Sequence, residues 1–142
     1  MMAMVSGKRG RIVSVDLPGV FPWGESGSDE RLKSVIEDLK SLGYDAHLFL
    51  GDSKSQEIVK AVSDLGPFDL VFIDGDHTYE GVREDWKNYA PLGRTVVLHD
   101  IIKPKEGERQ ELGVWKLWTE IHDEKQEYLG KDSKMGLGIV YR

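Results

Sequence analysis

The chain has 142 residues, a net charge of −6 at pH 7 and no cysteine. Its length fits one domain spanning residues 1–142, and 39% hydrophobic with 31% charged residues is typical of a globular protein rather than a disordered or membrane one. The acidic charge argues against a general nucleic-acid-binding surface. The lack of cysteine excludes disulfides and thiolate metal sites and fits a cytoplasmic location. We expect neither a signal peptide nor a membrane span, because no apolar run is long enough.

Strands and helices are predicted to alternate along the chain. A strand at 11–16 is followed by a Gly/Pro-rich loop at 17–28, and apolar residues then recur at helical spacing over 32–42. The later elements are a strand at 45–50, a helix over 58–65, a strand at 68–73, a helix over 82–89, a strand at 95–98, a charged loop at 103–111, a helix over 114–121, and a strand at 135–141 paired with a short one near 127–129. Such alternation predicts an α/β fold with a mostly parallel sheet.

Two short apolar runs, 71–73 and 96–98, end abruptly in acidic and imidazole side chains. These side chains are Asp74, Asp76, His77, His99 and Asp100. If both runs are neighbouring parallel strands, their carboxyl ends lie side by side, where open α/β sheets bind ligands. We therefore expect these residues to converge on one crevice.

Carboxylates at adjacent strand ends repel each other unless a positive charge lies between them. A divalent cation would supply that charge, with oxygen ligands from Asp74 and Asp100 and a nitrogen ligand or supporting hydrogen bond from His99. His77, three residues after Asp74, would lie beside the cation as a general base near neutral pH.

The same residues also have a structural explanation. Asp74 and Gly75 form a typical turn sequence, and Asp76 or Thr78 could cap the helix that follows. Asp76 could equally join the metal ligands or hydrogen-bond the loop that Gly75 permits. The residues alone leave these explanations open.

Two further acids follow the preceding strands. Asp16 ends the strand at 11–16 and could accept hydrogen bonds from two ribose hydroxyls, or it could form a turn before Pro18. Asp52 could bind an adenine amino group or cap the next helix. Trp23, in the loop at 17–28, could contact a substrate.

Taken together, residues 12–16, 51–53, 68–79 and 96–100 resemble a class I S-adenosylmethionine-dependent methyltransferase. The similarity is to small-molecule O-methyltransferases with an Ile-Asp-Gly-Asp-His-x-Tyr signature, here residues 73–79, and residues 136–140 resemble the last strand of that group. The resemblance implies a Rossmann-like three-layer sandwich with a C-terminal antiparallel strand. It also implies S-adenosylmethionine as cofactor and a small-molecule acceptor, which loops 17–28 and 101–112 would contact.

The resemblance also assigns roles to single residues. It places Asp16 at the ribose hydroxyls, Asp52 at the adenine edge, and Asp74 at both the cofactor and the metal. Asp74, His99 and Asp100 correspond to positions that bind Mg²⁺ in metal-dependent relatives, and His77 corresponds to a proposed base. In the mechanism this implies, the metal lowers the pKa of a hydroxyl and His77 helps to remove its proton before the oxygen attacks the methyl group.

One part of the family pattern is missing from this sequence. The fold normally begins with a strand and a Gly-rich loop that approaches the methionine portion of the cofactor. Here residues 1–10 resemble the end of the helix that should follow this loop, with Ala3, Met4 and Val5 as its last apolar turn. The chain thus resembles a family member truncated at its amino-terminal half-site. Since the missing strand lies between those at 11–16 and 68–73, we expect an altered sheet or a compensating homodimer.

Two other functions compete with methyl transfer. One is a catalytically inactive remnant of the methyltransferase fold that only binds or assembles. The other is a phosphohydrolase, because residues 74–78 fit an Asp-x-Asp-x-Thr pattern in which the first Asp attacks phosphorus. That pattern usually closes the first strand of a fold, whereas two strand–helix units precede it here.

Overall fold

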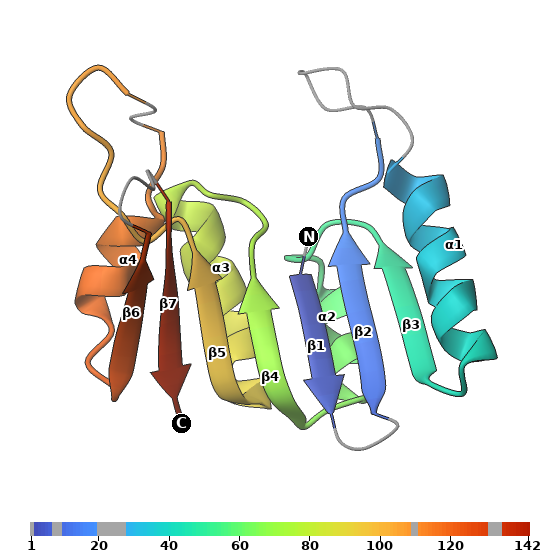
Figure 1. The fold of residues 1–142 in the computed structure, drawn as a ribbon. Helices are drawn as coiled ribbons and strands as arrows, with labels where there is room; N and C mark the ends of the chain where they lie inside the picture. The colour runs from blue at the N-terminus through green and yellow to red at the C-terminus, as the bar shows by residue number, and fades with distance from the viewer. Residues whose placement is uncertain (1, 7–9, 20–27, 109–110, 131–134) are drawn as a thin grey trace.

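The computed structural model describes residues 2–6, 10–19, 28–108, 111–130 and 135–142, and all structural statements refer to these residues (Figure 1). The elements are β1 (Met2–Ser6), β2 (Arg11–Asp16), α1 (Ser28–Ser41), β3 (Asp45–Leu50), α2 (Gln56–Ser63), β4 (Phe68–Ile73), α3 (Tyr79–Tyr89), a 3₁₀ turn (Ala90–Leu92), β5 (Gly93–His99), α4 (Val114–Glu120), β6 (Lys125–Leu129) and β7 (Gly136–Tyr141). From β2 onward these elements match those predicted by the sequence in order and type.

The seven strands form one sheet with the order β3-β2-β1-β4-β5-β7-β6 (Figure 1). Strands β2 and β3 are parallel, as are β4 and β5, while β7 is antiparallel to β5 and β6 is antiparallel to β7. The expected α/β fold with a C-terminal antiparallel strand is confirmed, and so is the pairing of the last two strands.

The amino-terminal segment departs from the prediction. Residues Met2–Ser6 form a strand rather than the end of a helix, and β1 lies between β2 and β4, antiparallel to both. Without β1, the facing edges of β2 and β4 would leave buried backbone groups unpaired, and five residues in strand conformation satisfy them. The expected gap between β2 and β4 is thus filled by residues Met2–Ser6 of the same chain, which run antiparallel to both neighbours. The homodimer stays a prediction.

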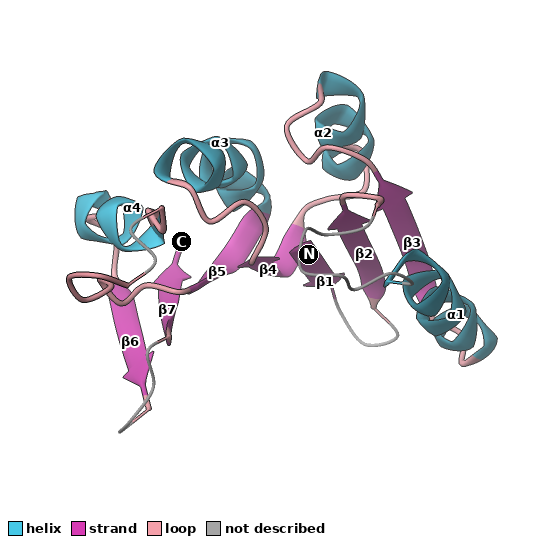
Figure 2. Cartoon of the chain, turned by 90° about the horizontal axis from the view of Figure 1, so that it is seen from above, coloured by secondary structure: helices cyan, strands magenta, loops and turns pink. Residues whose placement is uncertain are grey.

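The helices cover the two faces of the sheet unequally. Figure 2 shows α2, α3 and α4 together on one face and α1 on the other, beside β2 and β3. Side chains alternate between the faces of a strand, and the core lies between the sheet and the three-helix layer. Its buried members are Val13, Val15, Val62, Phe68, Val71, Ile73, Val82, Tyr89, Ala90, Val96, Leu98, Ile101, Val114, Leu117, Trp118, Ile121 and Val140.

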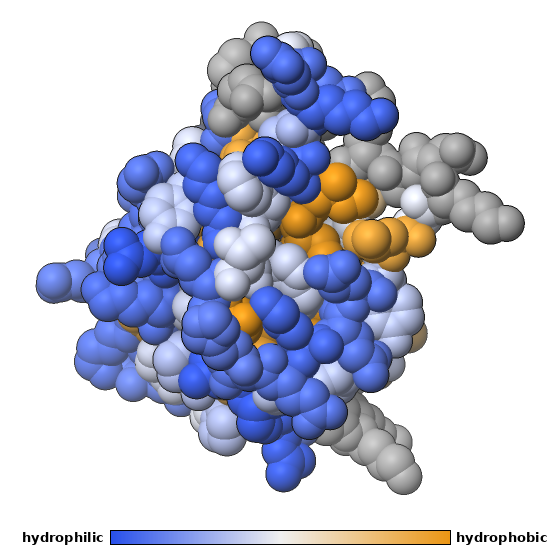
Figure 3. Space-filling model, turned by 90° about the vertical axis from the view of Figure 1, so that its left-hand side faces the viewer, coloured by the Kyte–Doolittle hydropathy of each residue, from blue (hydrophilic) through white to orange (hydrophobic). Residues whose placement is uncertain are grey.

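Near the β6 edge, several large apolar side chains remain exposed. Tyr128, Leu129, Met135, Leu137 and Tyr141 are each at least 38% exposed. The view from that side shows an orange hydrophobic patch next to an otherwise mostly hydrophilic surface (Figure 3). No helix in the described part of the chain is both long and apolar enough to cross a membrane.

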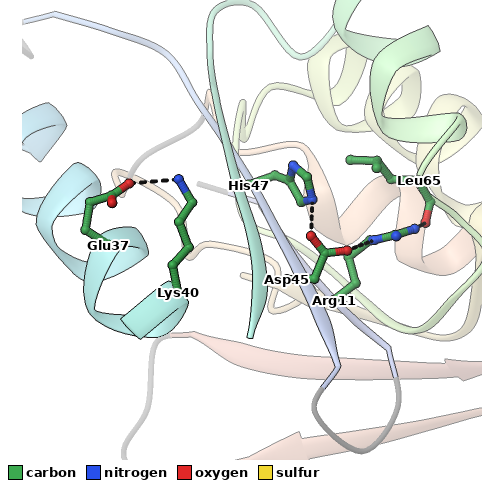
Figure 4. A network of polar contacts seen from close by, with 6 residues as sticks. All are labelled: Arg11, Glu37, Lys40, Asp45, His47 and Leu65. Atoms are coloured by element: carbon green, nitrogen blue, oxygen red, sulfur yellow. Dashed lines mark hydrogen bonds and ion pairs between the residues drawn. The ribbon is translucent and has the colours of Figure 1, made fainter. Parts of the chain in front are cut away.

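A polar network fixes the amino ends of β2 and β3 (Figure 4). Arg11 donates to Asp45 at 2.6 Å and to the carbonyl of Leu65 at 2.7 Å, and His47 contacts the other carboxylate oxygen of Asp45 at 2.7 Å. The hydrogen bonds from Arg11 and His47 lower the pKa of Asp45. On α1, Lys40 pairs with Glu37 at 2.8 Å. This network holds the sheet at the edge opposite to the carboxyl ends of the parallel strands.

Candidate functional site

The parallel strands β2, β3, β4 and β5 all end at one edge of the sheet, called here the carboxyl edge. Asp16 is the last residue of β2 and is paired with Leu50, the last residue of β3. Asp74 and Asp100 directly follow β4 and β5, whose residues Ile73 and Leu98 are paired. The structure thus places the polar residues at these four strand ends along one edge, as the sequence predicted.

Four residues form a close acid–histidine cluster at this edge, namely Asp74, His77, His99 and Asp100. Nε2 of His77 lies 2.9 Å from Oδ1 of Asp74, and Nδ1 of His77 lies 2.8 Å from Oδ2 of Asp100. An imidazole ring can donate from both nitrogens only when it is protonated. His77 is therefore placed to neutralise or exchange a proton with either carboxylate.

His99 approaches the two carboxylates differently. Its Nδ1 lies 3.2 Å from Oδ1 of Asp74 and 3.5 Å from Oδ1 of Asp100, within ion-pair distance. Even so, neither Nδ1 of His99 nor Oδ1 of Asp100 has a hydrogen-bond partner, and both atoms are buried. The two contacts are therefore ion-pair contacts without a hydrogen bond.

Asp100 is held in an unusual backbone conformation. Its φ is 61°, in the left-handed region that non-glycine residues rarely adopt, and its side chain is only 5% exposed. Such conformations cost about 1–3 kcal/mol and occur often at functional sites. Here the turn directs the Asp100 carboxylate back toward His77 and His99 instead of into solvent.

The cluster keeps Asp74 ionised. Burial raises the pKa of Asp74, but the hydrogen bond from His77 and the nearby charges of His99 and His77 outweigh it, so the pKa lies below its usual value. Carboxylate and imidazole donor atoms of Asp74, His77 and His99 all lie within 4.8 Å of one another, close enough to bind one metal ion.

Asp76 stays outside the cluster and has the structural role that the sequence left open. Its Oδ1 accepts hydrogen bonds from the backbone and hydroxyl of Thr78, and its Oδ2 pairs with Lys54 at 2.9 Å. Thr78 is the N-cap of α3, accepting from the backbone of Gly81. Burial raises the pKa of Asp76, but the bonds from Lys54 and Thr78 lower it below its usual value.

A buried acid that the sequence did not single out, Asp85, lies next to the loops that follow β3 and β4. Asp85 of α3 is fully buried, and its Oδ1 accepts from Ser53 at 2.7 Å, while the Tyr89 hydroxyl donates to the carbonyl of Ser53. A Cβ at Gly75 would lie 3.1 Å from Oδ2 of Asp85. One sequence signal was available, because Asp85 lies between Val82 and Tyr89 on the apolar face of a predicted helix.

The backbone around His77 is fixed by the start of α4. Gly113 donates its N–H to the carbonyl of His77 at 2.8 Å, and any Cβ at Gly113 would overlap the backbone of Tyr79. Glycine is therefore required at this contact for steric reasons. The contact also positions the backbone that carries the His77 side chain.

The other two predicted residues are Asp16, the last residue of β2, and Asp52, in the turn after β3. These two acids are called here the β2–β3 pair. Asp52 is exposed and its carboxylate accepts from the backbone of Lys54 at 2.9 Å, forming a turn. The predicted capping role of Asp52 is wrong, since Ser55 is the N-cap of α2 and its hydroxyl accepts from Ile58. Trp23 and much of the loop at 17–28 lie outside the described residues.

A family model described as a methyltransferase domain matches residues 1–101, more than half of the chain. The chain belongs to this family of methyltransferase domains. The matched region runs from β1 to the residue after Asp100, so it contains the β2–β3 pair and the whole acid–histidine cluster of the methyltransferase domain. No curated protein sequence matches the chain.

Solved structures share the fold of this methyltransferase domain. The MycE methyltransferase from the mycinamycin biosynthetic pathway, in complex with Mg and SAH, is 16% identical with a TM-score of 0.50, and the match covers 92% of this chain and 44% of MycE. A proposed caffeoyl-CoA O-methyltransferase from Staphylococcus aureus is 10% identical with a TM-score of 0.55, and the match covers 97% of this chain and 77% of that protein. The chain thus spans less than half the length of MycE.

Proposed function

We propose that this methyltransferase domain transfers a methyl group from S-adenosylmethionine to a hydroxyl group of a small molecule. The observation that carries the proposal is the position of two separate polar groups at one sheet edge. The β2–β3 pair offers carboxylates at neighbouring strand ends, and the acid–histidine cluster offers a base and possible metal ligands at the ends of β4 and β5. MycE, a structural neighbour, is complexed with SAH and Mg.

In this proposal the cofactor binds over the β2–β3 pair. Asp16 accepts hydrogen bonds from the two ribose hydroxyls, since its two oxygens can accept in a fork. Asp52, exposed in the turn after β3, binds the adenine edge. Asp74, at the end of β4, faces the cofactor from the other side of β1. S-adenosylmethionine supplies an electrophilic methyl group that needs no further activation.

The acceptor hydroxyl then lies over the acid–histidine cluster. Nε2 of His77, which contacts Asp74 at 2.9 Å in the structure, takes the proton of the hydroxyl once the acceptor replaces that contact, while Asp100 holds the imidazole ring through Nδ1 at 2.8 Å. Asp74, His99 and Asp100 would hold a divalent cation, which would supply positive charge beside the hydroxyl. The loop at 101–112 follows this cluster and contributes acceptor contacts.

The Asp-x-Asp-x-Thr alternative has less support. In a phosphohydrolase the second acid must exchange a proton with the substrate. Here that acid is Asp76, whose carboxylate caps α3 through Thr78 and pairs with Lys54. A generic phosphate ester should therefore not be hydrolysed, and turnover that is lost in Asp74→Asn would favour the phosphohydrolase.

Calorimetric titration with S-adenosylhomocysteine tests the proposal. We expect saturable binding, weakened about tenfold or more in Asp16→Asn, because hydrogen bonds to a charged acceptor contribute about 1.5–3 kcal/mol. The matched control is Asp69→Asn, an exposed acid near the start of β4 at the opposite edge of the sheet, which should bind like the wild type. An absence of binding would instead favour the inactive remnant.

A further inference from the structure

Two buried atoms of the acid–histidine cluster have ion-pair contacts but no hydrogen-bond partner among the described residues. Nδ1 of His99 and Oδ1 of Asp100 are buried, make no hydrogen bond and lie 3.5 Å apart. Leaving one such atom unsatisfied costs about 1–3 kcal/mol, so native proteins rarely do so. Two orphaned atoms that face each other in an ionic cluster point to a shared ligand.

The spacing of the donor atoms fits a single metal ion. Two ligand atoms, each about 2.1 Å from one ion, are about 3.0 Å apart at neighbouring octahedral positions and about 3.4 Å apart at tetrahedral positions. Nδ1 of His99 lies 3.2 Å from Oδ1 of Asp74 and 3.5 Å from Oδ1 of Asp100. Nδ1 of His99 is thus spaced from each of the two carboxylate oxygens as two ligands of one ion are, while the donors that all lie within 4.8 Å of one another are those of Asp74, His77 and His99.

The chemistry of these donors differs from what Mg²⁺ prefers. Mg²⁺ is a hard ion that takes oxygen ligands and retains several waters, whereas imidazole nitrogen suits Zn²⁺, Fe²⁺, Co²⁺ and related ions. His99 supplies a nitrogen near both carboxylates, and the second imidazole, from His77, has a donor within 4.8 Å of those of Asp74 and His99. The magnesium assignment implied by the family resemblance therefore does not fit the donor set of this chain.

We infer that Asp74, His99 and Asp100 bind a transition-metal dication such as Zn²⁺ or Co²⁺ in preference to Mg²⁺. His99 is the residue that determines this preference. Oδ1 of Asp100 binds the ion, and Oδ2 of Asp100 contacts Nδ1 of His77 at 2.8 Å. The inference deepens the proposed function, on which it rests for the role of the ion, but the choice of metal follows from the donor atoms alone.

The test compares metal preference with and without the nitrogen donor. Metal-stripped wild type and His99→Asn are titrated calorimetrically with Zn²⁺, Co²⁺ and Mg²⁺ in the absence of S-adenosylhomocysteine. Asparagine keeps the approximate size of histidine but offers oxygen in place of Nδ1. We expect the ratio of Zn²⁺ to Mg²⁺ affinity to fall about tenfold or more in His99→Asn, because oxygen donors favour the harder ion. The visible absorption bands of the Co²⁺-loaded protein should shift in the same variant.

Two further variants separate a specific site from general binding. His122→Asn removes an exposed histidine outside the cluster and should change neither the affinity ratio nor the Co²⁺ bands. Asp100→Asn keeps the nitrogen donor and should weaken all three metals while preserving the preference, which also tests the site if His99→Asn does not fold. The inference is overturned if wild type binds Mg²⁺ as tightly as Zn²⁺, if no metal binds, or if His99→Asn leaves the ratio unchanged. S-adenosylhomocysteine binding without metal would still support methyl-donor binding in each case.

Discussion

Replacing Gly81 with alanine should destabilise the protein, although alanine is normally favoured in a helix. A Cβ at Gly81 would overlap the carboxylate of Asp76, which must then leave the hydrogen bonds of Thr78 and the ion pair with Lys54. The two hydrogen bonds contribute about 0.5–1.5 kcal/mol each, and the partly exposed ion pair contributes about 0.2–1 kcal/mol. Against this loss, alanine gains up to about 1 kcal/mol in helix propensity. We expect a net destabilisation of about 1.5 kcal/mol, measured by urea unfolding at pH 7.

A double-mutant cycle with Asp76→Ala isolates the cause. Asp76→Ala removes the three atoms that lie nearest to the new Cβ, so Gly81→Ala should stabilise the Asp76→Ala background by up to about 1 kcal/mol. The effect of Gly81→Ala on the free energy of unfolding thus changes sign between the wild type and the Asp76→Ala background. If Gly81→Ala stabilises the wild type as well, the carboxylate is not fixed above the glycine and the reasoning about this loop is wrong.

Two further substitutions test the support of the loops at the carboxyl edge. Burial raises the pKa of Asp85 above 3.8. As pH rises from about 4 to this raised pKa, the Asp85 carboxyl stays protonated in the folded state but loses its proton in the unfolded state, so the stability of the wild type falls over this range. Asp85→Asn has no such proton to release, so the stability of the variant relative to wild type should rise between about pH 4 and the folded pKa of Asp85 and level off above it. Urea unfolding at several pH values would measure this difference. A difference that does not change with pH would contradict the burial argument. Gly113→Ala should destabilise by about 1–3 kcal/mol because its Cβ meets the backbone of Tyr79, which cannot rotate away. Thermal unfolding would measure this loss, and unchanged stability would show that the contact adapts.

Most of the helices and strands were predictable because apolar periodicity is a local property of the sequence. The strands Arg11–Asp16, Asp45–Leu50 and Phe68–Ile73 have the predicted bounds, since each apolar run ends at a turn residue. The amino-terminal segment was not predictable in this way, because a short run such as Met2–Ser6 is compatible with helix and strand alike. Its conformation is decided by the open edges of β2 and β4, which are far away in the sequence.

The site was predictable to the same extent and for the same reason. Strand ends that lie next to each other bring Asp74, His99 and Asp100 together, and the loop after β4 adds His77. The sequence could not show which carboxylates belong to the acid–histidine cluster and which have a structural role. Asp76 became a structural residue because Lys54, 22 positions earlier, reaches it from the neighbouring loop. The orphaned atoms of His99 and Asp100 depend on side-chain angles that no sequence pattern encodes.

The reversed direction of β1 limits how the described residues could contact the proposed cofactor. β1 ends with Ser6 paired to Arg11, at the edge opposite to the carboxyl edge, and it starts between β2 and β4, with Met2 paired to Val15 and Ile73. A Gly-rich loop following the central strand therefore cannot approach the methionine portion from that position. If the proposed function is right, the described residues then bind the cofactor through the ribose and adenine contacts proposed for Asp16 and Asp52. We expect S-adenosylhomocysteine and 5′-methylthioadenosine, which lacks the amino-acid portion, to bind within about threefold of each other in calorimetric titrations, a difference of roughly 0.6 kcal/mol. A much tighter complex with S-adenosylhomocysteine would show that other residues of this chain bind the amino-acid portion.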